Sequence, residues 1–85
     1  MNLYLLSQNV NNDYDTYDCA IVCAKNKSDA LTIHPDRSEK EFKEETERTY
    51  FRTWVGKKSD IHCKLIGIAS PRIKRGVVCA SFNAG

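Results

Sequence analysis

Four cysteines are the residues of this 85-residue chain with the widest range of possible chemistry: Cys19, Cys23, Cys63 and Cys79. Each stands in an apolar, strand-like run, and no two are spaced Cys-x2-Cys as a zinc site on a turn requires. Cys19 and Cys23 share one face of an extended segment, about 13 Å apart, too far for a disulfide. We therefore predict reduced, buried, structural thiols, with no metal ion and no cofactor.

Catalytic constellations are equally sparse. The two histidines, His34 and His62, have no nucleophile or paired carboxylate near them in the sequence pattern, and the chain contains no glycine-rich phosphate loop. Asp13, Asp15 and Asp18 lack the spacing and the glycine of a calcium-binding EF-hand loop. The sequence thus argues against an enzyme and predicts no catalytic residues.

An acidic run rich in tyrosine is the first candidate binding site. Residues 9–17 contain the asparagines and aspartates typical of a loop. Tyr14, Asp15 and Tyr17 lie within or beside this loop and are candidate partner-binding residues, because tyrosine offers a large contact area at low entropic cost. The alternative is that one tyrosine folds back onto the core and the carboxylates are only solvated.

A second candidate lies in residues 49–55, where aromatic and β-branched side chains predict a strand, with a helix as the alternative. Arg52 and Trp54 belong to the residue types that anchor protein interfaces and are partner-binding candidates. The competing interpretation of Trp54 is an ordinary core residue.

Charge is distributed unevenly along the chain. Residues 1–47 hold ten acidic and five basic side chains (−5), whereas residues 48–85 hold one acidic and eight basic (+7). Either the two halves neutralise each other or the second half forms a basic face for nucleic acid. In antiparallel strands the 56–60 and 70–76 loops fall at opposite ends, which would divide that patch. Its candidate residues are Arg48, Lys57, Lys58, Arg72, Lys74 and Arg75.

Four strands are predicted to position these residues, at 3–8, 18–25, 61–69 and 77–82. The 18–25 segment is apolar on both faces and is therefore expected to be a central strand covered on both sides. In the 61–69 strand one face changes from polar to apolar along its length, which predicts that it passes from solvent into the core. Residues 56–60 are predicted to form a hairpin loop.

Helical signals are weaker. Residues 28–34 predict a short helix with Ser28 as its N-cap and Pro35 as its stop. Residues 36–48 are strongly polar and predict a surface helix or a loop. Together these elements predict a single domain, residues 1–85, of the α+β class: a mostly antiparallel sheet of four to five strands with one short helix packed on one face.

Assembly and location follow from general features. The small core leaves apolar strands to cover, so a homodimer in which the last strand pairs across a two-fold axis is one expectation. No apolar run is long enough for a transmembrane helix, and the first residues lack the basic region of a signal peptide. We therefore expect no membrane contact and a cytoplasmic location.

Both ends of the chain resemble a group of small proteins from phages and prophages. The resemblance rests on the opening MNLYLLSQN, the YDTYD run at residues 14–18, the short helix ending at His34-Pro35, and the closing GVVCASFNAG at 76–85. It covers roughly the first third and the last tenth of the chain. The resemblance implies an origin in a mobile genetic element and a location in the host cytoplasm. Because the group has no assigned activity, the resemblance carries over no catalytic residues.

The resulting expectation is an accessory protein that binds a host macromolecule, most readily a host protein. By analogy with other small phage proteins, inhibition of a host defence such as CRISPR is one form this could take. Nucleic-acid binding by the basic second half is the alternative.

Overall fold

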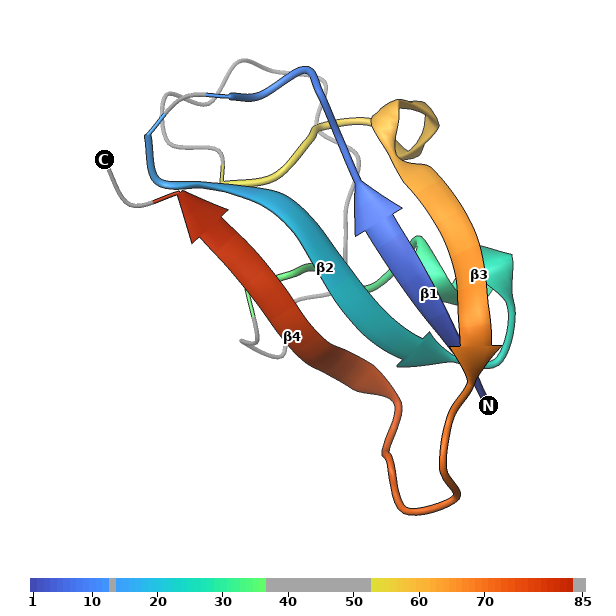
Figure 1. Cartoon of the computed structure of the whole chain (residues 1–85). Coiled ribbons are helices and arrows are strands. Elements are labelled where there is room, and N and C mark those ends of the chain that lie inside the picture. The colour runs from blue at the N-terminus through green and yellow to red at the C-terminus, as the bar shows by residue number, and fades with distance from the viewer. Residues whose placement is uncertain (13, 37–52, 84–85) are drawn as a thin grey trace.

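The chain folds around one antiparallel sheet, seen here in a computed structural model that describes residues 1–12, 14–36 and 53–83. Its strands are β1 (Asn2–Ser7), β2 (Thr16–Ala24), β3 (His62–Ile68) and β4 (Gly76–Asn83). They lie in the order β3-β1-β2-β4, and every neighbouring pair is antiparallel (Figure 1). With one short α-helix on the sheet, this confirms the predicted small α+β domain.

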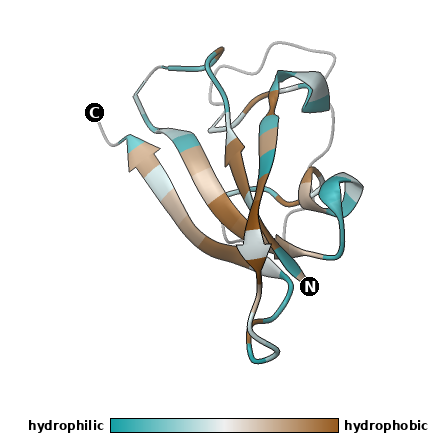
Figure 2. Ribbon diagram, turned by 45° about the vertical axis from the view of Figure 1, so that its right-hand side comes forward, coloured by the Kyte–Doolittle hydropathy of each residue, from teal (hydrophilic) through white to brown (hydrophobic). Residues whose placement is uncertain are grey.

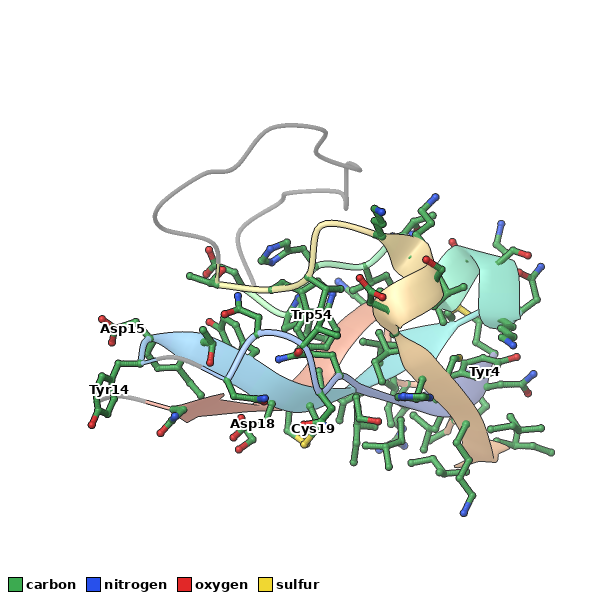
Figure 3. The ribbon with its side chains drawn as sticks, turned by 90° about the horizontal axis from the view of Figure 1, so that it is seen from above. Tyr4, Tyr14, Asp15, Asp18, Cys19 and Trp54 are labelled. Atoms are coloured by element: carbon green, nitrogen blue, oxygen red, sulfur yellow. The ribbon has the colours of Figure 1, made fainter. Side chains whose placement is uncertain are left out.

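The central position of β2 is also confirmed, because β1 pairs with it on one side and β4 on the other. Its Ala20, Val22 and Ala24 are buried on the core face. On the opposite face Cys19 and Ile21 are half-buried, whereas Cys23 is wholly buried and its Sγ lies 3.8 Å from Ile73 O of the loop between β3 and β4. Among the described residues the expected cover on both faces is therefore only partial on this face: α1 and Trp54 lie on one side of the sheet, and Cys19 points to the other (Figure 3).

The hydrophobic core lies between the sheet and this one-sided cover. Alternate side chains of β1 and β2 meet the short helix α1 (Lys27–Ala30) and the segment 53–61. The wholly buried members include Leu6, Val22 and Trp54. Burying a side chain of this size contributes about 1.5–3 kcal/mol. Figure 2 shows the hydrophobic colour concentrated along the central strands, with hydrophilic residues in the connecting loops.

Helix α1 covers one face of the sheet as predicted, but it is shorter than the expected 28–34 and begins earlier. Its N-cap is Asn26, whose side-chain oxygen accepts from Asp29 N at 2.9 Å, so Ser28 lies inside the helix. After Ala30 the chain tightens into a turn, and the Thr32 hydroxyl donates to Asp29 O at 2.6 Å. Such local side-chain bonds compete with helix continuation.

The predicted strand at 49–55 is not present in its described part. Residues 53 and 54 form a bend and Val55 has no regular structure, so none of them is in a strand. Residues 49–52 lie outside the described residues, as do residues 37–48 of the polar segment. Thr53 O instead accepts from Tyr17 N at 2.8 Å. The expected 56–60 hairpin loop contains a 3-10 turn, η1 (Lys58–Asp60), that leads into β3.

Side-chain burial along β3 changes in the direction opposite to the predicted one. Ile61, just before it, is buried, whereas Ile68 at its end is 84 % exposed. β3 is an edge strand, and its register with β1 shifts between Leu3 and Tyr4. At this point β3 has one extra residue, which changes which of its side chains lie on each face of the sheet. The apolar end of the strand is thus left in solvent.

Candidate functional site

The β1–β2 connection, residues 9–15, together with the first residues of β2, forms a built structure that we call the acidic loop (residues 9–18). The buried side chain of Gln8 is its scaffold. Gln8 Nε2 donates to Asn11 O at 2.7 Å and to Tyr17 O at 3.0 Å, while Gln8 Oε1 accepts from Val10 N at 2.9 Å and Asn11 N at 2.8 Å. One side chain thereby ties the two ends of the loop together.

The loop is also attached to distant parts of the chain. Asn11 Nδ2 donates to Trp54 O at 3.0 Å, which links the loop to the core segment. Asp15 adopts a left-handed backbone with φ of 60°, and its N–H donates to Asn83 O at the end of β4. Aspartate tolerates this conformation better than most residues do. These contacts attach the described residues of the loop to one end of the sheet.

What the loop presents to solvent is aromatic and acidic. The Tyr14 side chain is 77 % exposed, and Asp15 and Asp18 are exposed. Within the described residues neither carboxylate forms an ion pair. Figure 3 shows Tyr14 and Asp15 together at one end of the sheet, with Asp18 on the side away from Trp54. Such a surface can accept hydrogen bonds and pack against a cationic partner.

The two tyrosines have separate roles. Tyr17 is half-buried and its ring lies 4.9 Å from that of Phe82, at 52°, in a tilted aromatic pair. Tyr17 therefore helps to attach the loop to β4, and Tyr14 is the tyrosine of this loop that stays exposed. The interpretation in which one tyrosine folds back fits Tyr17, and a partner-binding role for Tyr14 stays a prediction.

The other candidate anchors are not brought into this surface. Trp54 is wholly buried in the core, as the competing interpretation held, and its Nε1 has no hydrogen-bond partner among the residues that the structure describes. Arg52 lies outside the described residues, as does Arg48 of the basic set.

The remaining basic residues divide between the two ends of the sheet. Lys57 and Lys58 precede β3 at its His62 end, which pairs with Ser7. Arg72, Lys74 and Arg75 follow the Ile68 end, which pairs with Asn2 (Figure 1). A seven-residue strand, about 23 Å long, separates the two groups. The prediction that the two loops lie at opposite ends is confirmed, and these residues do not form one patch.

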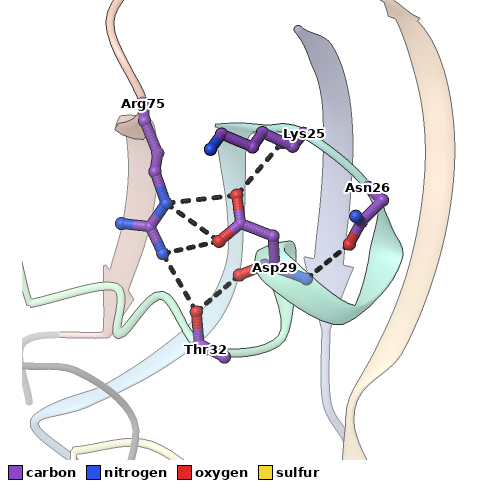
Figure 4. Close-up of polar contacts among 5 residues, drawn as sticks. All are labelled: Lys25, Asn26, Asp29, Thr32 and Arg75. Carbon is purple, nitrogen blue, oxygen red and sulfur yellow. Dashed lines mark hydrogen bonds and ion pairs between the residues drawn. The ribbon is translucent and has the colours of Figure 1, made fainter.

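Arg75 has a structural contact that the sequence analysis missed (Figure 4). Its Nη2 lies 2.8 Å from Asp29 Oδ1, its Nε donates to both carboxylate oxygens, and Nη2 also donates to the Thr32 hydroxyl at 3.0 Å. The Arg75 hydrogen bonds lower the pKa of Asp29, with smaller contributions from the backbone N–H of Lys25. This ion pair fastens the β3–β4 loop to α1. No local sequence signal marks a pair 46 residues apart.

All four cysteines are free thiols. Cys23 is buried, and burial raises the pKa of the half-buried Cys63 thiol. The prediction of four buried thiols is therefore correct only for Cys23: Cys19 and Cys63 are half-buried, and Cys79, which pairs with Ile21 on the edge strand β4, is exposed.

Within residues 1–12, 14–36 and 53–83, no helix has the length and apolar character needed to cross a bilayer. Comparisons of the chain with known family models, with curated proteins and with solved structures find no match.

Proposed function

We propose that this chain is an accessory protein of a phage or prophage that binds a protein of the bacterial host through the acidic loop. One observation carries the proposal. The loop is held by contacts to Gln8, Trp54 and Asn83, yet the side chain of its most exposed aromatic residue, Tyr14, is 77 % exposed.

The physical argument is preorganisation. A loop that is already ordered loses little conformational entropy on binding, so more of the contact energy appears as affinity. Tyr14 provides a rigid aromatic contact, and Asp15 and Asp18 favour a partner surface that carries lysine or arginine. Tyr17 acts in this proposal by keeping the loop in place.

The biological setting follows from the resemblance to phage and prophage proteins. A small binding module without catalytic residues acts by occlusion, and host defence systems, CRISPR among them, are targets of that kind. Such a protein works in the cytoplasm of the host.

Nucleic-acid binding by the second half of the chain is the less favoured proposal. Lys57 and Lys58 are separated from Arg72 and Lys74 by the length of β3, and Arg75 is engaged by Asp29. Such binding would weaken steeply as salt rises.

The test is affinity purification from lysate of a bacterial host, with and without nuclease. It compares the wild type, Tyr14→Ala, and the matched control Ile68→Ala, which truncates an even more exposed side chain at the other end of the sheet. We expect a nuclease-resistant protein that the wild type and the control retain and that Tyr14→Ala loses.

The recovered protein is then purified and titrated by calorimetry against all three chains. Loss of at least about tenfold in affinity with Tyr14→Ala alone supports the proposal, since a truncated interface anchor costs more than 1 kcal/mol. Equal binding by all three chains contradicts the acidic loop as the site. Material lost on nuclease treatment favours nucleic acid instead.

A further inference from the structure

The end of the sheet opposite the acidic loop gathers cationic side chains from both halves of the chain. β2 and β3 both end beside Asn2, the first residue of β1. The segments that follow them, residues 25–27 and 69–75, therefore lie at the same end (Figure 1). Their cationic residues, which we call the basic end, are Lys25, Lys27, Arg72, Lys74 and Arg75. The two lysines come from the acidic half of the chain, so the distribution of charge along the sequence does not reveal this group.

Little of the described structure neutralises the basic end. Asp29 is the one carboxylate in residues 25–30 and 69–75, and it is already paired with Arg75. The other four cationic side chains are exposed, and none of them forms an ion pair among the described residues. Residues 37–52 hold five acidic and five basic side chains and so bring no net charge. The basic end and its one carboxylate together carry a formal charge of +4.

The β3–β4 loop presents part of this charge on a fixed support. Because β3 and β4 are first and last in the strand order, the loop crosses the whole end of the sheet. It is attached at Ile73, whose carbonyl oxygen lies 3.8 Å from Cys23 Sγ, and at Arg75, which pairs with Asp29 (Figure 4). The loop projects beyond the ends of the strands, and its residues 70–72 are exposed (Figure 1). The charges are thus held in place before a ligand binds, which reduces the entropic cost of binding.

The acidic loop is far enough away to leave the basic end independent. Its nearer exposed carboxylate, Asp18, stands six residues before Ala24 at the end of β2, about 20 Å along the strand. The Debye length is about 10 Å at 0.1 M salt, so most of the repulsion between Asp18 and an anion at the basic end is screened.

The composition of the basic end indicates which polyanion it fits. Residues 70–72 contain no large hydrophobic side chain, whereas a loop that enters a bilayer carries such groups. Residues 25–27 and 69–75 contain no aromatic side chain, and single-stranded nucleic acids are bound largely by stacking on aromatic rings. A duplex requires neither feature, because lysine and arginine hold its phosphates without reading the bases.

We propose that the basic end binds the phosphate backbone of double-stranded DNA without reading its sequence. Arg72 and Lys74 contact phosphates from the projecting loop, and Lys25 and Lys27 contact them from the turn after β2. Arg75 stays paired with Asp29 and positions the loop. The acidic loop, at the other end of the sheet, remains accessible to a host protein, but the inference does not rest on that proposed function.

The test is fluorescence anisotropy with a labelled DNA duplex of about 20 base pairs, titrated from about 50 to about 200 mM salt. Four phosphate contacts give a slope of about −3.6 for the logarithm of affinity against that of salt, a loss on the order of a hundredfold over this range. Two duplexes of unrelated sequence are expected to bind equally. No binding at low salt, or a slope shallower than about −1, overturns the proposal.

A pair of matched variants locates the binding surface. Lys27→Gln and Lys57→Gln each remove one exposed lysine, at opposite ends of the sheet. Lys27→Gln is expected to lower affinity about tenfold at low salt and to make the slope shallower by about 1, whereas Lys57→Gln changes affinity by less than about twofold. Arg72→Gln is expected to act as Lys27→Gln does. Circular dichroism checks that each variant is folded. An effect of Lys57→Gln without one of Lys27→Gln overturns the basic end as the site.

Two further probes separate this proposal from its alternatives. Ile68, just before the loop, is 84 % exposed and is the side chain that a bilayer would contact. We expect no sedimentation with vesicles of phosphatidylglycerol and phosphatidylcholine, and sedimentation without duplex binding overturns the proposal in favour of a membrane surface. Tighter binding of the single strand than of the duplex also overturns it. Tyr14→Ala is expected to bind the duplex as the wild type does, so failure of either proposal leaves the other standing.

Discussion

Replacement of Gln8 by glutamate tests how the acidic loop is built. The two side chains have the same shape, but the carboxylate has no N–H groups. Both donations from Gln8, to Asn11 O and Tyr17 O, are lost, and a negative oxygen is placed against the two carbonyl oxygens. The two bonds that Gln8 Oε1 accepts, from Val10 N and Asn11 N, can persist.

The cost follows from these two lost bonds. An acceptor left without its donor in a buried site costs about 1–3 kcal/mol, and access of water to the partly buried loop reduces this. We expect Gln8→Glu to lower the free energy of unfolding by about 2–3 kcal/mol. That is a large fraction of the roughly 5–10 kcal/mol typical of a domain this size, but it leaves the fold populated.

The assay is urea unfolding followed by the emission of Trp54, the single tryptophan, whose burial makes it a reporter of the core. Hydrogen exchange of the Val10 and Asn11 amides reports the loop itself. Asn12→Asp is the matched control, an amide-to-carboxylate change at an exposed position of the same loop. A loss below about 0.5 kcal/mol, or one equal to that of the control, would refute Gln8 as the scaffold.

Three further predictions concern stability and are measured by urea unfolding, followed by Trp54 emission wherever that residue is kept. Asp29→Asn is expected to lower the free energy of unfolding by on the order of 1 kcal/mol, since Arg75 is 40 % exposed and water screens the pair. Because the pKa of Asp29 is lowered in the fold, the difference from wild type should be full above the ordinary pKa of 3.8 and should vanish as pH falls through the lowered pKa. A difference that instead grows in acid would contradict the ion pair as its source. Gly76→Ala is expected to cost about 1–2 kcal/mol of stability, because the backbone at Gly76 has φ of 136°. The control is Gly67→Ala: an added Cβ meets no atom within 4 Å at either glycine, but Gly67 has an ordinary φ, so its replacement should change stability by less than about 0.5 kcal/mol. Equal costs at the two positions would exclude backbone strain as the cause. Trp54→Ala, followed by circular dichroism, is expected to cost about 3–5 kcal/mol through the cavity it leaves, and a cost below about 1 kcal/mol would show that Trp54 is not a core residue.

Much of the sheet could be predicted from the sequence, because the signals that specify strands are local. The alternation of side chains in residues 18–25 identified a strand with an apolar residue at nearly every position, and its central place follows from that. The antiparallel order of successive strands is then enough to place Lys57 and Arg72 at opposite ends of the sheet. The acidic loop was likewise visible in its composition, since asparagine and aspartate suit turns.

Other features depend on contacts between residues far apart in the chain, and these only the tertiary structure decided. Trp54 has the composition of an interface anchor, and nothing local reveals that α1 and the sheet enclose it. The sequence around Arg75 predicts part of a basic patch, whereas in the fold Arg75 pairs with Asp29, 46 residues away. In the same way, the separate roles of Tyr14 and Tyr17 depend on where Phe82 lies. Residue types and periodicity determine which segments become strands and loops, whereas the partner of each side chain is set by how those segments pack.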